Sequence, residues 1–181
     1  MSHFAISAVG ADRPGIVAAV TLALVEQGCN LEDTEMSVLR GHFAMMLVVS
    51  GPEGLTAGAL EQALIGAGAG AAIGGLVVAV RAIDDGVPES PDGEPWSVSV
   101  YGADRPGIVH AVTSLLAEAG ANIVGLETRL IGPADHPVYA MLLDVTVPEA
   151  VDGAALAERL ATEAAEVGVE CSMHPTDADI L

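Results

Sequence analysis

The stretch that decides the fold is Ala-Asp-Arg-Pro-Gly-Ile-Val at residues 11–17, which the chain repeats unchanged at residues 103–109. When residues 10–31 are aligned with residues 102–123 without a gap, 15 of the 22 positions are identical. A repeat of this length predicts two homologous modules of about 80 residues each, rather than one continuous domain.

The residues around each copy predict a strand, a turn and a helix. A strand-like run precedes the repeat at residues 4–9 and 96–101. Asp12 and Asp104 are well placed as helix N-caps, with Pro14 and Pro106 in the first helical turn. Apolar residues then recur at helical spacing. The glycine of each copy has no side chain, so a ligand could approach the backbone amides closely.

The same pattern extends over both halves of the chain. We expect an α+β protein with two βαββαβ modules, each a four-stranded antiparallel sheet with two helices on one face. Gly28 and Gly120 stand where a helix commonly ends in a left-handed glycine. The predicted strands are residues 3–9, 31–39, 43–49, 76–82, 96–101, 123–131, 138–147 and 169–173, and the predicted helices are residues 14–27, 56–66, 106–119 and 154–165.

The expected boundaries are module 1 at residues 1–83, an acidic Pro/Gly linker at 84–95, module 2 at 96–175 and a short tail at 176–181. The two strands that follow the first helix of module 1 should be joined at Arg40-Gly41-His42, and module 2 carries four extra residues in the equivalent hairpin, within 132–137. The glycine-rich segment at 66–71 resembles a dinucleotide-binding motif. It follows a helix and leads into a strand, so we interpret it as a loop.

The charge of the chain excludes several classes of partner. It has 25 acidic residues against six basic ones, a net charge of −19. Direct binding to nucleic acid or to an anionic membrane depends on basic residues, so we expect neither. The N-terminus has no basic segment typical of a signal peptide, and the two cysteines occupy non-equivalent places. We therefore expect a cytoplasmic protein with Cys29 and Cys171 as reduced core residues.

No arrangement of residues in the sequence points to catalysis. The five histidines, at positions 3, 42, 110, 136 and 174, are scattered and have no metal-binding spacing. Cys29 has no neighbouring histidine that could activate its thiol. We predict no catalytic residues, no metal site and no cofactor.

The strand, the Asp-Arg-Pro-Gly-Ile-Val turn, the helix and the Gly-x-Asn that follows resemble the ACT domain, a ferredoxin-like module that typically binds amino acids. The tandem arrangement is similar to the glycine cleavage system transcriptional repressor family, and each module is similar to the N-terminal ACT module of formyltetrahydrofolate deformylases. The resemblance implies a ligand held between the repeated turn of one module and the second strand of another. By position it implies these ligand-binding residues: Asp12, Arg13, Pro14, Gly15, Asn30, Asp104, Arg105, Pro106, Gly107 and Asn122.

Other interpretations of these residues stay open. The aspartates could simply cap helices, the asparagines could fix a turn, and the arginines could pair with local acids or meet a partner. Three function classes follow. The first is a non-enzymatic regulator that senses an amino acid such as glycine and acts through a protein partner. The second is a ligand-free structural or dimerisation module on a metabolic enzyme. The third is an enzyme fragment, disfavoured because no hydrolase domain follows module 2.

The apolar composition also predicts association between modules. Hydrophobic residues make up 51% of the chain, and each first helix carries a single charge, at Glu26 or Glu118. Exposed strand edges and apolar helix faces invite pairing. We expect the modules to pair within one chain or across a homodimer.

Overall fold

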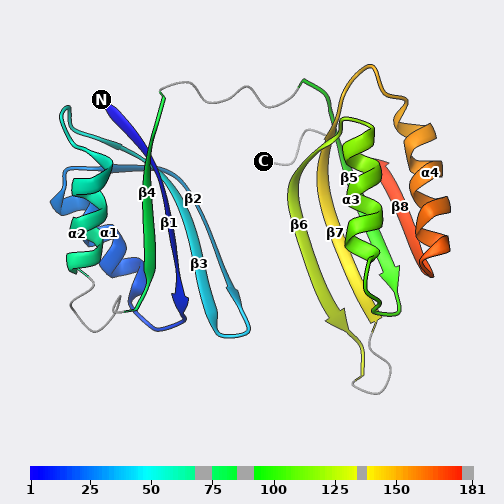
Figure 1. Cartoon of the computed structure of the whole chain (residues 1–181), viewed down its shortest axis with the longest axis horizontal. Coiled ribbons are helices and arrows are strands. Elements are labelled where there is room, and N and C mark those ends of the chain that lie inside the picture. The colour runs from blue at the N-terminus through cyan, green and yellow to red at the C-terminus, as the bar shows by residue number, and fades with distance from the viewer. Residues whose placement is uncertain (68–74, 85–91, 134–137, 177–181) are drawn as a thin grey trace. The chain divides into compact units, whose positions relative to one another are not determined.

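The computed structural model describes residues 1–67, 75–84, 92–133 and 138–176. The chain divides into two compact units, residues 1–87 and 88–181, and both have the predicted order of strands and helices (Figure 1). Parts of the linker, the glycine-rich loop, the second hairpin and the tail (85–91, 68–74, 134–137 and 177–181) lie outside the described residues.

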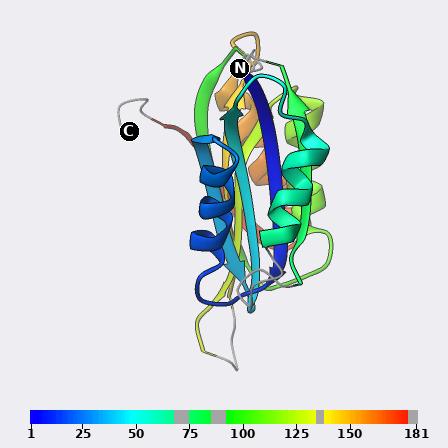
Figure 2. The same ribbon diagram turned by 90° about the vertical axis from the view of Figure 1, so that its left-hand side faces the viewer.

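Module 1 contains one antiparallel sheet in the order β2-β3-β1-β4. The two helices, α1 and α2, lie side by side on one face of this sheet (Figure 2). The elements are β1 (Ser2–Ala11), α1 (Ile16–Glu26), β2 (Asn30–Leu39), β3 (His42–Gly51), α2 (Ala57–Ala67) and β4 (Val77–Ile83).

Module 2 repeats this plan in the order β6-β7-β5-β8, which confirms the predicted fold class. Its first strand begins at Glu94, so Glu94 and Pro95 belong to a strand and not to the predicted linker. The elements are β5 (Glu94–Gly102), α3 (Ile108–Glu118), β6 (Asn122–Ile131), β7 (Val138–Val147), α4 (Gly153–Glu166) and β8 (Val169–Pro175).

Each module has its own apolar core between the helices and one sheet face. In β1, Phe4, Ile6 and Ala8 are buried while the alternate residues are not, as expected for a strand covered on one side. Val20 and Leu24 of α1 pack in the same core at helical spacing. Module 2 builds its core from equivalent positions, with Val98 and Val100 on β5 beneath Val112 and Leu116 on α3. Both cysteines are free thiols that are partly buried and pack against these cores.

The hairpin and the helix ends follow from backbone geometry. Leu39 pairs with His42, so Arg40 and Gly41 form a two-residue turn, and both have positive φ, as the favoured hairpin turn requires. Gly28 ends α1 as predicted: its amide donates to the Val25 carbonyl, and the next amide donates to Leu24. The same pair of hydrogen bonds closes α3 after Gly120, so both helices end in a Schellman motif.

The helix starts differ from the prediction. The N-caps of α1 and α3 are Gly15 and Gly107, with φ of 92° and 100°, and neither helix has a side-chain cap. Asp12 and Asp104 are therefore not N-caps, and Pro14 and Pro106 precede the helices instead of lying in their first turns. Each helix begins at this left-handed glycine, three residues after the aspartate, so the aspartate lies outside the helix that it was expected to cap.

We expect Gly15→Ala to destabilise module 1 by about 1–2 kcal/mol, because an L-residue resists the left-handed conformation. The matched control is Gly58→Ala on α2 of the same module. Gly58 has no positive φ, and a Cβ added there would meet no atom within 4 Å, so alanine should stabilise the helix by up to about 1 kcal/mol. Chemical denaturation of the full chain measures both changes. A neutral Gly15→Ala would show that the turn tolerates another backbone conformation.

Candidate functional site

The repeated turn leaves backbone amides at the start of α1 and α3. The first amides with a partner inside each helix belong to Ala19 and Ala111, which donate to the carbonyls of Gly15 and Gly107 at 3.0 and 2.9 Å. The three amides before them in each helix have no acceptor one turn back. Such amides, together with the positive end of the helix dipole, favour a carboxylate or another anion.

The two asparagines lie at the opposite end of each module from the turn. Asn30 and Asn122 are the first residues of β2 and β6, and both side chains are exposed. They follow an 11-residue helix, which at 1.5 Å per residue separates them from the turn by about 16 Å. A single module therefore does not bring Asn30 to the Asp12–Gly15 turn, or Asn122 to the Asp104–Gly107 turn.

The two arginines of the repeat lie against a glycine near the start of the last strand of their module. A Cβ on Gly75 would lie 3.4 Å from Nη2 of Arg13, and a Cβ on Gly168 would lie 2.7 Å from Nη1 of Arg105. Gly168 follows the C-cap of α4, and its amide donates to the Ala165 carbonyl. The Arg105 guanidinium therefore lies at the negative end of α4, where a cation is stabilised. This placement gives both arginines a packing role within their own modules.

The turn of module 1 is also held by the hairpin between β2 and β3. The Asp12 amide donates to the Gly41 carbonyl at 2.9 Å. The turn is thus fixed from two sides, by this hydrogen bond and by the start of α1. Asp12, Arg13, Pro14 and Gly15 are all exposed, and so are their counterparts Asp104, Arg105, Pro106 and Gly107.

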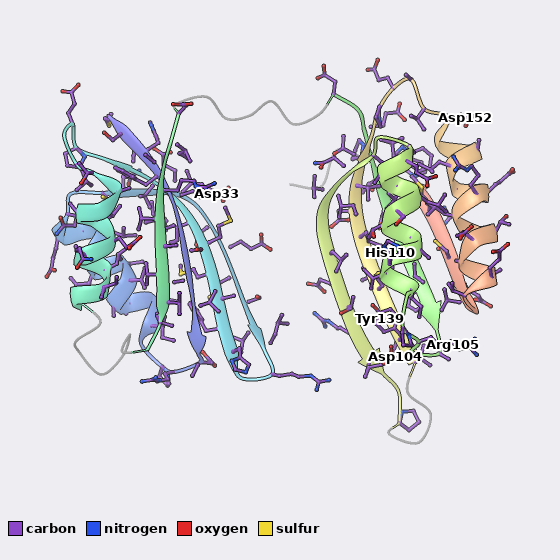
Figure 3. The ribbon with its side chains drawn as sticks, in the orientation of Figure 1. Asp33, Asp104, Arg105, His110, Tyr139 and Asp152 are labelled. Atoms are coloured by element: carbon purple, nitrogen blue, oxygen red, sulfur yellow. The ribbon has the colours of Figure 1, made fainter. Side chains whose placement is uncertain are left out.

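In module 2 a tyrosine joins the residues at the turn. Tyr139 on β7 lies near Asp104 and Arg105 at one end of the sheet (Figure 3). Burial raises the pKa of the Tyr139 hydroxyl, a hydrogen bond with the Thr128 side chain lowers it, and the Asp104 carboxylate raises it. The net shift in the pKa is upward, so Tyr139 is a neutral hydroxyl at physiological pH.

Sequence reasoning missed this tyrosine and its threonine partner. Aligned with module 1, Tyr139 takes the place of Phe43, and Thr128 takes the place of Met36. Phe43 is fully buried, so a tyrosine at the same position keeps its ring against the core and brings a hydroxyl to the edge. The alignment of the two hairpins shows that Tyr139 replaces Phe43. It does not show that the Tyr139 hydroxyl lies near Asp104.

The described residues contain no group of three or more His, Cys, Asp and Glu side chains that could hold a metal ion. Burial raises the pKa of the Cys29 thiol and raises the pKa of Cys171 to about 11, so neither is an activated nucleophile. A surface groove of about 340 Å³ on β2 and β3, lined by residues 33–35 and 46–48, contains none of the predicted ligand-binding residues. In the described ranges, no helix is long and apolar enough to span a membrane.

Comparisons with known proteins match both modules to the ACT domain, over residues 2–73 and 96–163. The glycine cleavage system transcriptional repressor of Escherichia coli is 30% identical over 176 residues, which cover 95% of this chain and 89% of that protein. The phosphoserine phosphatase SerB2 of Mycobacterium tuberculosis is 32% identical over 172 residues, which cover 91% of this chain but only 40% of that protein.

Among the solved structures that match this chain, two cover nearly all of it with a TM-score above 0.6. A protein from Galdieria sulphuraria, described only as an unknown protein, has a TM-score of 0.77 at 31% identity, covering 97% of this chain and 99% of that one. A putative glycine cleavage system transcriptional repressor has a TM-score of 0.66 at 19% identity, with coverage of 97% and 98%, which supports the fold alone. These matches, together with the fold and the repeated turn, show that the chain belongs to the ACT-domain family and carries two ACT modules in tandem.

Proposed function

We propose that this chain is a non-enzymatic regulatory protein of the cytoplasm that senses an amino acid such as glycine and acts through a protein partner. The observation that carries the proposal is the repeated turn, where two helices begin at a left-handed glycine without a side-chain cap. An amino-acid carboxylate matches the amides at these helix starts. Whole-length similarity to a glycine cleavage system transcriptional repressor supports the regulatory role and makes glycine the first ligand to test.

The placement of the asparagines supports a ligand site built from two modules. Because Asn30 and Asn122 lie a helix length from the turn of their own module, a site that uses both groups needs two modules. We propose that the turn of one ACT module binds the carboxylate and that the asparagine of another module, in the same chain or in a second copy, binds the ammonium group. The amide oxygen of an asparagine is a suitable acceptor for that group.

The alternative function is a ligand-free structural or dimerisation module that docks on a metabolic enzyme. The packing of Arg105 against Gly168 favours it, because it explains one residue of the repeat without any ligand. Similarity to part of a phosphoserine phosphatase also favours it, since a region like this chain accompanies a catalytic protein there. Amino-acid binding separates the two functions.

Titration calorimetry of the full chain with glycine tests the proposed function. Asn30→Ala and Asn122→Ala should each weaken binding by about 0.5–1.5 kcal/mol, the usual net contribution of one hydrogen bond. The matched control is Ser37→Ala, another exposed polar residue on β2, which should leave affinity unchanged. If the parent binds and both asparagine variants bind equally well, these residues are not in the site. If glycine does not bind, the titration is repeated with the other amino acids, and binding of none of them favours the alternative function.

We predict no catalytic turnover, including no deformylase activity. A deformylase needs a positioned base or metal. The described residues contain no group of three or more His, Cys, Asp and Glu side chains that could hold a metal ion, and burial raises the pKa of both thiols. The purified chain should release no formate from formyltetrahydrofolate above the rate in buffer. Formate release that is lost on heat denaturation would show that an active site exists.

We also predict no direct binding to DNA at about 0.15 M salt, because a chain of net charge −19 repels the phosphate backbone. Any effect on transcription would then require a protein partner. Gel retardation of a promoter fragment by the chain alone should show no shift at micromolar protein. A sequence-specific shift would mean that the chain contacts DNA itself.

A further inference from the structure

The sheet of module 2 carries a groove on the face away from the helices. At its centre is Ala140 of β7, which pairs with Arg129 on β6 and with Tyr101 on β5, so one small residue stands between two long ones. The next residue, Met141, is buried in the core, and Ala140 therefore faces the other side of the sheet. The groove has a volume of about 280 Å³ and is lined by Tyr101, Glu127, Arg129, Ile131, Ala140 and Leu142.

Module 1 has a groove of the same volume at the equivalent place. Its floor is Ala44, which pairs with Ser37 on β2 and with Val9 on β1. Its lining also contains a glutamate, Glu35, at the position of Glu127 in module 2. The two grooves therefore share an alanine floor and a carboxylate, but module 1 has serine and valine where module 2 has arginine and tyrosine. The pairing of the strands creates the hollow in both modules, and the side chains around it decide what it can hold.

Two opposite charges lie side by side in the module 2 groove. The Nη2 atom of Arg129 donates to Oε2 of Glu127 at 3.2 Å, and the two residues stand on the same face of β6. Both side chains are mostly exposed, so water screens the ion pair and the pair adds little to the stability of the module. This one hydrogen bond uses only part of the donors of a guanidinium and of the acceptor sites of a carboxylate. The pair can therefore offer a cation and an anion together to a ligand.

The rest of the groove is aromatic and aliphatic. Tyr101, Leu142 and Ile131 are all exposed, although large apolar side chains gain free energy when they are covered. Arg129 and Tyr101 stand two strand spacings apart, which places their Cα atoms roughly 9–10 Å from each other. Only the methyl group of Ala140 lies between them. Two stacked or edge-on aromatic rings have their centroids about 4.5–7 Å apart, so a ring laid over Ala140 against Tyr101 fits this width.

We propose that the groove over Ala140 binds one aromatic α-amino acid. The ligand's carboxylate pairs with the guanidinium of Arg129, its ammonium group pairs with the carboxylate of Glu127, and its ring packs on Tyr101. Charge selects this class of ligand, because an adjacent cation and anion match a zwitterion, whereas a ligand of one sign leaves one of them unmatched. Size agrees, because a groove of about 280 Å³ lies just below the range of about 300–1,000 Å³ that holds drug-sized ligands.

This groove is a different site from the repeated turn. The groove lies on the sheet face away from the helices, whereas Ile108, the first residue of α3, is buried in the core on the helical face. The groove also lies within module 2 and needs no residue of another module. The inference therefore goes beyond the proposed function and does not depend on it.

Titration calorimetry of the full chain with L-phenylalanine tests the proposal. Phenylacetate lacks the ammonium group and phenethylamine lacks the carboxylate, so each should bind at least about tenfold more weakly than phenylalanine. Arg129→Ala and Tyr101→Ala should each weaken phenylalanine binding by about tenfold or more, whereas Tyr101→Phe, which keeps the ring, should not. The matched control is Arg81→Ala, which removes an exposed arginine of β4 in module 1 and should leave the affinity unchanged.

The groove of module 1 allows the converse test. The double variant Val9→Tyr/Ser37→Arg supplies the two side chains that this groove lacks beside Glu35, and a second phenylalanine should then bind to each chain. Both positions are exposed, so circular dichroism should remain unchanged.

Several results would overturn the proposal, and they differ from those that would overturn glycine binding at the turn. One is the absence of phenylalanine binding at millimolar concentration. Another is binding that Asn30→Ala or Asn122→Ala weakens and Arg129→Ala does not, which would place the ligand at the turn. Equal affinity for phenylacetate would show that the groove does not select a zwitterion. A folded module 1 double variant that binds no second molecule would show that arginine and tyrosine do not make the site.

Discussion

Burial of only one sheet face is the constraint on which the rest of the structure depends. Each module has four strands and two helices, so the helices cover one side of the sheet and the other side remains in contact with solvent. A module of this size buries a small core and has little stability to spare. Its exposed apolar side chains, such as Val25 on α1 and Met46 on β3, therefore matter as much as its buried ones.

The repeated turn stabilises the fold of its module and leaves backbone amides available for binding. Its glycine reverses the chain and starts the helix, and its arginine lies against a glycine near the start of the last strand, Gly75 in module 1 and Gly168 in module 2. These interactions fix the turn without using the amides at the helix start. Because the aspartates do not cap those amides, the helix dipole at Ile16 and Ile108 is left for an anion or for water. The same short motif can thus hold its module together and remain available to a ligand.

The two modules have diverged on a common backbone. At two equivalent positions, module 1 has an apolar residue and module 2 has a polar one. Phe43 corresponds to Tyr139, and Leu22 corresponds to Ser114. In module 2 the change places a neutral hydroxyl near Asp104 and Arg105. In module 1, Leu22 adds to the aliphatic surface of α1. The repeated turn and the asparagine that follows the first helix are identical in the two modules, whereas these neighbouring positions differ.

The sequence by itself determined the number of modules and the order of their elements. These features depend on repetition and on periodicity, which are properties of neighbours along the chain. The hairpin at Gly41 and the helix ends at Gly28 and Gly120 were predictable because turn chemistry is local. The N-caps were not predictable, because a helix can begin after an aspartate or after a left-handed glycine. Which of the two is the N-cap depends on the path of the chain into the helix. Tertiary structure alone decided that Arg105 meets Gly168, that Glu61 reaches Val80, and that Asn30 lies away from the turn. Each of these depends on the packing of helices on a sheet, which brings together residues far apart in the chain and separates residues that one motif seems to unite.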